Sequence, residues 1–163
     1  MAFLGDSLTS GWRLREEEAY PALVGRALAA RGLRVLVSGT AAERDTAERV
    51  VAAIGRSAVA LAGRTDLPAL AALCADATLA VCNDSGLAHL AAATGAATVQ
   101  IYGSASSAWT HALGDRVRVV QRPPVCSPCW QRTCRIGYAC LAAVTVDDVL
   151  RAGDALARER AAG

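Results

Sequence analysis

The stretch that decides the fold is residues 78–102, TLAVCNDSGLAHLAAATGAATVQIY. Its first five residues form an apolar run, which predicts a buried strand over 78–82. The Ala- and Leu-rich part predicts a helix over 85–94, ended by Gly95, because glycine readily adopts the conformation that follows a helix. Residues 97–102 predict a second buried strand. Strands that are apolar throughout and alternate with helices indicate a parallel sheet covered on both faces.

The same alternation extends outward in both directions from this stretch. We expect further strands at 2–4, 33–38, 57–61 and 117–120, and further helices at 16–31, 41–54, 66–75 and 145–160. Asp66 and Thr145 are the expected N-caps of the helices at 66–75 and 145–160. Together these elements predict an α/β fold: one Rossmann-like domain over 1–163 with a doubly wound parallel sheet. Ligands of such sheets bind beyond the carboxyl ends of the strands.

Composition narrows the classes of partner. The chain has 163 residues and a net charge of +2, so the charge gives no indication of a nucleic-acid partner. No apolar run reaches the roughly 18 residues that a membrane span needs, and the start does not resemble a signal peptide. We therefore expect a cytoplasmic protein without a transmembrane segment, with a location at the inner face of the membrane left open.

Residues 83–89, NDSGLAH, follow a predicted strand and open a predicted helix. The free amides of Ser85, Gly86 and Leu87, together with the helix dipole, would form an anion site. His89 lies four residues after Ser85 and therefore shares its helix face, where it can donate to a phosphate oxygen. Asp84 precedes the helix and is placed to accept from a sugar or ribose hydroxyl. The alternative is structural, with Asp84 or Ser85 serving only as an N-cap.

Cysteines gather in the predicted loop 122–140, as Cys126, Cys129, Cys134 and Cys140. Their spacing leaves three interpretations open: a zinc or iron–sulfur site, two disulfides, or free thiols that pack the loop. We favour a structural role without metal. The other two cysteines, at 74 and 82, lie in apolar segments and are expected to be buried as small hydrophobic residues.

The N-terminal segment 2–32, with FLGDSLTSGW, resembles the first block of GDSL (SGNH) hydrolases. In that family the serine that matches Ser7 is the nucleophile, which needs a histidine base. That base follows an aspartate by three positions, but His89 and His111 follow Gly86 and Ala108 instead. We therefore expect a structural first strand-loop-helix unit and keep an esterase that uses Ser7 as the alternative.

Residues 33–163 resemble the C-terminal half of family 9 glycosyltransferases, closest to the heptosyltransferase II type. The resemblance rests on SGTAAERDTAERV (38–50), LAGRTDLPALAALCADA (61–77), CNDSGLAHLAAATGAATVQIYGS (82–104) and CSPCWQRTCRIGYACL (126–141). It implies half of a two-domain (GT-B) glycosyltransferase that binds ADP-heptose, needs no metal or other cofactor, and transfers heptose to the lipopolysaccharide inner core. The implied donor-binding residues are Gly39, Thr40, Glu43, Thr65, Leu67, Asp84, Ser85, Gly86 and His89.

Two parts of the family pattern are missing from this sequence. One is the N-terminal half, which carries the acceptor site and the general base. The other is a Lys-bearing glycine-rich loop, in whose place the GDSL segment stands. We therefore expect a chimera that joins 1–32 to 33–163, binds ADP-type ligands weakly and does not turn over alone. A non-catalytic chimeric fold is the remaining alternative.

Overall fold

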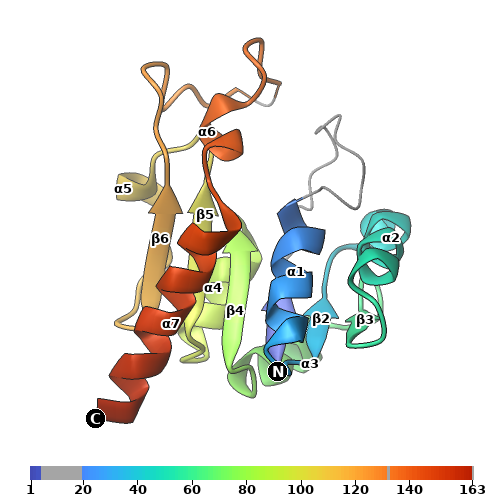
Figure 1. Ribbon diagram of the computed structural model, residues 1–163. Coiled ribbons are helices and arrows are strands. Elements are labelled where there is room, and N and C mark those ends of the chain that lie inside the picture. Colours follow the sequence, from blue (N-terminus) through green and yellow to red (C-terminus); the bar gives the residue numbers. More distant parts are fainter. Residues whose placement is uncertain (5–19, 132, 163) are drawn as a thin grey trace.

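The computed structural model describes residues 1–4, 20–131 and 133–162, and they form one parallel sheet with helices on both faces (Figure 1). The sheet has six strands in the order β3-β2-β1-β4-β5-β6, and every neighbouring pair is parallel. The strands are β1 (Ala2–Leu4), β2 (Val35–Val37), β3 (Ala58–Ala60), β4 (Leu79–Asn83), β5 (Thr98–Tyr102) and β6 (Val117–Gln121). This order confirms the predicted doubly wound sheet.

The helices divide between the two faces of the sheet. They are α1 (Tyr20–Ala30), a 3₁₀ turn η2 (Ala41–Glu43), α2 (Arg44–Ile54), α3 (Leu67–Ala75), α4 (Gly86–Ala93), α5 (Ser107–Thr110), α6 (Ala139–Ala142) and α7 (Val146–Ala162). Helices α1, α2 and α7 share one apolar cluster with the sheet, whereas α3 and α4 share the other. Among the described residues, every helix falls short of the length and apolarity of a membrane span.

Alternation along each strand sends side chains to both layers. In β2, Val35 and Val37 join the α1/α2/α7 cluster, and Leu36 joins the α3/α4 cluster. Cys74 and Cys82 are buried in this second layer, as predicted. Because both faces of the strands are covered, their sequences are continuous apolar runs.

The chain reverses its direction across the sheet at β1. From β1 it moves outward through β2 to β3, and from β4 it moves the other way through β5 to β6. Ligands of such sheets bind at this switch point, beyond the carboxyl ends of the strands. The segment that follows β1, residues 5–19, includes the GDSL motif and Ser7 and lies outside the described residues.

The predicted elements are confirmed with ends that differ by a few residues, and two short helices were not predicted. The expected helix over 41–54 is split into η2 and α2, and the start of α6 falls inside the expected loop 122–140. Helices α5 and α6 have four residues each, too few for an apolar period to show. The residues 16–19 of the first predicted helix lie outside the described residues.

Two loops at the carboxyl edge, after β2 and after β3, are packed backbone to backbone. The N–H of Gly63 donates to the carbonyl of Gly39 at 3.0 Å. Gly63 has a φ of +67°, and a Cβ placed on it would lie 2.7 Å from the Cα of Ala41. Only glycine fits here without strain, so Gly63 fixes the position of one loop against the other.

Replacing Gly63 with alanine tests this contact, and Gly32 provides the matched control. Gly32 has a φ of +79°, but its Cβ would meet no atom within 4 Å. We expect Gly32→Ala to lower the free energy of unfolding by about 1–2 kcal/mol, the cost of a left-handed residue with a Cβ. Gly63→Ala should cost about 1–3 kcal/mol more because it is also overpacked. Urea unfolding measures both; equal losses would show that the loops are not in contact.

The N-terminus of α7 is held by a buried carboxylate. Asp148 is 8% exposed and accepts from the N–H of Thr145 at 3.1 Å, while its own N–H donates to the Thr145 hydroxyl at 3.1 Å. Both Arg122 and Arg151 form ion pairs with it. The predicted Thr145 cap is therefore confirmed. These Thr145 hydrogen bonds, followed by the two guanidinium groups, lower the pKa of Asp148 from 3.8 to about 2.

The lowered pKa of Asp148 makes stability depend on acid pH. A carboxyl whose folded-state pKa is depressed contributes stability above its ordinary pKa, and this contribution is lost as pH falls. We expect urea unfolding midpoints to fall as the pH drops from 3.8 towards about 2. Asp148→Asn should remove this part of the pH dependence. Asp147→Asn, in the same helical turn, is the control and should retain it; the same pH profile in both variants would contradict the assignment.

Candidate functional site at the carboxyl edge of the sheet

The loop after β2 presents a glutamate that is fixed by its own turn. Oε2 of Glu43 accepts from the N–H and from the hydroxyl of Thr40, both at 2.8 Å. A Cβ on Gly39 would lie 3.2 Å from the same oxygen, so glycine allows the close approach. The other oxygen, Oε1, makes no hydrogen bond within the described residues and can accept from a ligand hydroxyl. Sequence-predicted Gly39, Thr40 and Glu43 therefore form one structural unit.

The loop after β3 leads into α3 and presents an apolar side chain. Asp66 caps the helix, because its Oδ1 accepts from the N–H of Ala69 at 2.9 Å. Leu67 begins the helix with 66% of its surface exposed. Thr65 precedes the cap and is half-buried. An exposed leucine beside a half-buried threonine is suited to contact with the ring of a nucleoside.

The turn after β4 leaves donors unused where α4 begins. Ser85 is the N-cap in extended conformation, yet its side chain does not cap the helix, and its buried Oγ has no partner among the described residues. A Cβ on Gly86 would meet no atom of the described residues within 4 Å, so they leave the space above it open. His89 is exposed one turn further on. The geometry leaves the first amides of α4 and the imidazole available to an anion.

Asp84 lies beside a hydroxyl pair that the sequence did not reveal. The Thr110 hydroxyl is 3.4 Å from Oδ1 of Asp84 and 3.2 Å from the hydroxyl of Tyr102. Burial, together with the nearby Asp84 carboxylate, raises the pKa of Tyr102 to about 12, so the phenol stays protonated. Thr110 belongs to α5, which has only four residues and was therefore not predicted from the sequence. The serine that precedes α5, Ser106, was the available signal, since it is the N-cap of this helix.

The four clustered cysteines lie beyond the ends of β5 and β6. Cys126 is exposed, Cys129 and Cys134 are half-buried, Cys140 is buried, and all four are free thiols. Sγ of Cys134 accepts from the N–H groups of Ile136 and Tyr138 at 3.4 and 3.1 Å. Burial raises the pKa of Cys140, and Cys134 and Cys129 add to the rise.

This arrangement bears on the interpretations left open for the cysteines. Within residues 1–4, 20–131 and 133–162, no three His, Cys, Asp or Glu side chains are grouped so as to hold a metal ion. The N–H groups of Cys129 and Trp130 both donate to the carbonyl of Ser104 at 3.0 Å. The cysteine loop is thereby attached to the end of β5.

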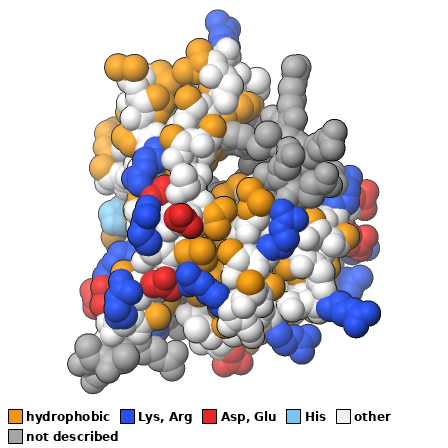
Figure 2. Space-filling model, viewed as in Figure 1, with side chains coloured by type: hydrophobic (Ala, Val, Ile, Leu, Met, Phe, Trp, Pro, Cys, Tyr) orange, Lys and Arg blue, Asp and Glu red, His pale blue; other side chains and the backbone are white. Residues whose placement is uncertain are grey.

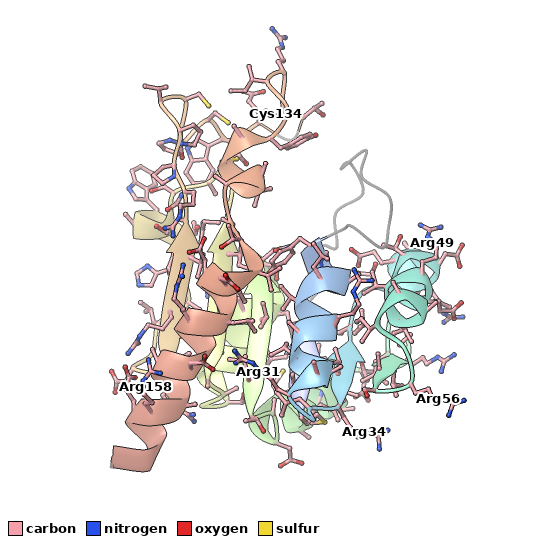
Figure 3. The ribbon with its side chains drawn as sticks, in the orientation of Figure 1. Arg31, Arg34, Arg49, Arg56, Cys134 and Arg158 are labelled. Atoms are coloured by element: carbon pink, nitrogen blue, oxygen red, sulfur yellow. The ribbon has the colours of Figure 1, made fainter. Side chains whose placement is uncertain are left out.

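The candidate site consists of two groups separated by β1. The loops after β2 and β3 hold Glu43, Thr65 and Leu67, and the turn after β4 holds the remaining residues. Figure 3 shows that Cys134 lies beyond the same end of the sheet, whereas Arg31, Arg34, Arg56 and Arg158 extend from the lower part of the molecule. These four arginines therefore do not contribute to the site.

Comparison with known proteins identifies relatives with the same fold. The chain matches glycosyltransferase family 9 (heptosyltransferase) over residues 16–139. It is 36% identical over 119 residues to lipopolysaccharide heptosyltransferase 1 of Pseudomonas aeruginosa, covering 72% of this chain and 33% of that protein. The solved structure of ADP-heptose lps heptosyltransferase II from E. coli superposes with a TM-score of 0.79 at 26% identity, covering 98% of this chain and 46% of that one. E. coli heptosyltransferase WaaC with ADP has a TM-score of 0.70 at 21% identity and supports the fold alone.

The same matches bear on the two resemblances seen in the sequence. The chain spans less than half the length of these relatives. The GDSL resemblance of residues 2–32 has no counterpart in these findings, and the esterase alternative gains no support from them. The family match begins at residue 16, within the segment that the sequence assigned to the GDSL-like unit. The parallel sheet, the carboxyl-edge loops and the match over 16–139 together establish that the chain belongs to glycosyltransferase family 9, the heptosyltransferases.

Proposed function

We propose that this chain is the donor-binding half of a heptosyltransferase that transfers heptose from ADP-heptose to a hydroxyl of the lipopolysaccharide inner core. The observation that carries the proposal is the turn after β4, where the described part of the chain provides no partner for the Ser85 hydroxyl and no atom close above Gly86. Such a turn at a helix N-terminus is suited to a diphosphate. The sugar and the acceptor are taken from the names of the relatives. These relatives include lipopolysaccharide heptosyltransferases 1 and 2.

The loops after β2 and β3 would bind the nucleoside part of the donor. Glu43 keeps Oε1 for a hydroxyl of the ribose or of the sugar, because Thr40 occupies only Oε2. Leu67 and Thr65 would contact the base. The packing of Gly63 on Ala41 keeps the two loops at a fixed separation, so both sets of contacts are positioned before the donor binds.

The turn after β4 would bind the diphosphate and stabilise it as the leaving group. In the proposed reaction the acceptor oxygen forms a bond to C1 of the heptose, with inversion, and the bond from C1 to the β-phosphate oxygen breaks. ADP leaves with the electron pair and thus gains negative charge, which the amides of Ser85 and Gly86 and the ring of His89 stabilise. The acceptor proton passes to a general base. No metal takes part.

The acceptor and the base would come from a second Rossmann-like half. The resemblance assigns both to the N-terminal half of these enzymes. The lipopolysaccharide acceptor would bring the reaction to the cytoplasmic face of the membrane, which is the proposed location. We expect the chain on its own to bind donor weakly and to transfer no sugar.

Calorimetric titration of the chain with ADP and with ADP-heptose tests the donor site. We expect saturable binding, weakened about tenfold or more in His89→Ala, since a hydrogen bond to a charged group contributes about 1.5–3 kcal/mol. Glu43→Gln should weaken binding less, because it keeps an acceptor oxygen. A chelator should leave the affinity unchanged.

The second histidine provides the matched control. His111 is exposed, and its Nδ1 contacts the carbonyl of Ser107 at 2.8 Å at the end of α5. His111→Ala should therefore retain the affinity of the parent chain for ADP. The proposal is wrong if millimolar ADP does not bind, or if His89→Ala and His111→Ala bind equally well.

A further inference from the structure

A buried glutamine fixes the chain just after the short helix α5. Gln100, in the middle of β5, is fully buried, and its Oε1 accepts from the N–H of Ala112 at 2.8 Å. Its Nε2 has no partner among the described residues. A buried amide that is only half paired costs stability, which an apolar side chain of similar size would avoid. Such departures from the most stable choice are expected where a residue serves function.

A second glutamine fixes the chain at the start of the same helix. Oε1 of Gln121, the last residue of β6, accepts from the hydroxyl of Ser107 at 2.7 Å. Its Nε2 donates to the carbonyl of Ala105 at 3.1 Å. A helix of four residues is not stable by itself, because the first turn of a helix is costly to form. The two glutamines of the sheet therefore determine where α5 lies.

These attachments are made by uncharged groups. Figure 2 shows charged side chains of both signs over α7 and α2, and the ion pairs of Asp148, Asp154 and Glu159 belong to α7. Within the described part of the chain, α5 instead depends on hydroxyl, amide and backbone groups. Salt screens interactions between charges, so the position of α5 should be nearly independent of ionic strength.

The side chain that this attachment places is Thr110, at the end of α5. Its hydroxyl lies 3.4 Å from Oδ1 of Asp84 and 3.2 Å from the phenol oxygen of Tyr102. Tyr102 is fully buried and keeps its proton, because burial and the Asp84 carboxylate raise its pKa to about 12. Two hydroxyl groups thus converge on one carboxylate. A carboxylate has about four lone-pair sites, so it can still accept from a ligand hydroxyl.

We propose that Thr110 is a positioning residue that holds the Asp84 carboxylate in the orientation in which it accepts a hydroxyl of the donor, and that Gln100 and Gln121 keep α5 in place for this contact. Asp84 is exposed, so without a partner its side chain would occupy several rotamers. Fixing one rotamer before the ligand binds lowers the entropy cost of binding. The ligand rests on the proposed function, whereas the orientation of Asp84 by Thr110 does not.

The place of this pair in the sheet determines which ligand should be sensitive to it. Asp84 and Thr110 lie on the β5 side of the turn after β4, whereas the loops that would contact the nucleoside lie on the β2 side of β1. The part of the donor beyond the diphosphate would therefore lie nearer the pair than the nucleoside does. We expect the contact to affect ADP-heptose more than ADP.

Calorimetric titration of Thr110 variants with both ligands tests this role. Thr110→Val keeps the shape of the side chain without its hydroxyl, and it should weaken ADP-heptose binding about three- to tenfold, the cost of ordering one side chain. Binding of ADP should change by less than about twofold, because ADP lacks the sugar. Thr110→Ser restores the hydroxyl and should restore the affinity. Gln121→Met should weaken binding in the same direction and add little to Thr110→Val, since both act through one carboxylate.

Thr94→Val is the matched control. It also removes a hydroxyl that donates to a backbone carbonyl, that of Ala91 at 2.9 Å, but it lies at the opposite end of α4 from Asp84. This variant should keep the parent affinity for both ligands. A loss in Thr94→Val equal to that in Thr110→Val would assign the effect to general destabilisation and contradict the proposal.

A double-mutant cycle tests the orientation of Asp84 without any ligand. In urea unfolding, Thr110→Val and Asp84→Asn together should cost less than the sum of their separate costs, because each single change already removes the contact between them. Additive costs would overturn the inference, and so would a Thr110→Val variant that binds ADP-heptose as the parent chain does. A parent chain that binds neither ligand would contradict the proposed function, and the cycle alone would then decide whether Thr110 orients Asp84.

Discussion

The pairing of β1 with both β2 and β4 is the constraint on which the rest of the structure depends. Residues Ala2–Leu4 pair with Val35–Val37 on one side and with Leu79–Val81 on the other. This short strand is the place where the two directions of winding meet, and its removal would separate β2 and β3 from β4, β5 and β6. Because Ala2 and Leu4 are almost fully buried, the contact is maintained by packing as well as by hydrogen bonds. The two groups of candidate site residues flank this strand.

Much of this fold was accessible from sequence because its strands are buried on both faces. Runs such as 78–82 and 97–102 are apolar throughout, and glycines at 32 and 95 end the helices before the next strands, with φ near +80°. The caps at Asp66 and Thr145 were also accessible, since they depend on local hydrogen bonds. Helices α5 and α6 were not, because four residues do not show a period and their stability comes from distant contacts.

The candidate site likewise has a part that the sequence predicts and a part that it does not. The positions of Glu43 and Ser85 follow from the ends of strands, which a periodic sequence reveals. The contact of Thr110 with Asp84 joins residues 26 positions apart, and the contact of Gly63 with Ala41 depends on how two loops pack. Neither leaves a local pattern in the sequence. The GDSL segment shows that a short local motif can also mislead. It resembles a catalytic block, but neither histidine has the spacing from an aspartate that the family's base requires.

The Thr110 hydroxyl, which contacts both Asp84 and Tyr102, also links the candidate site to a helix that carries a tryptophan. Thr110 has a single proton, which it can donate to the carboxylate of Asp84 or to the backbone carbonyl of Ser106, but not to both at once. A ligand that occupied the carboxylate would leave this proton to the carbonyl of Ser106, at the start of α5, the helix that carries Trp109. The indole of Trp109 lies at a tilt to that of Trp130 in the cysteine loop, with the ring centroids 6.5 Å apart. We therefore expect occupancy of the turn after β4 to change the surroundings of two fluorescent rings, which can be followed without any added label.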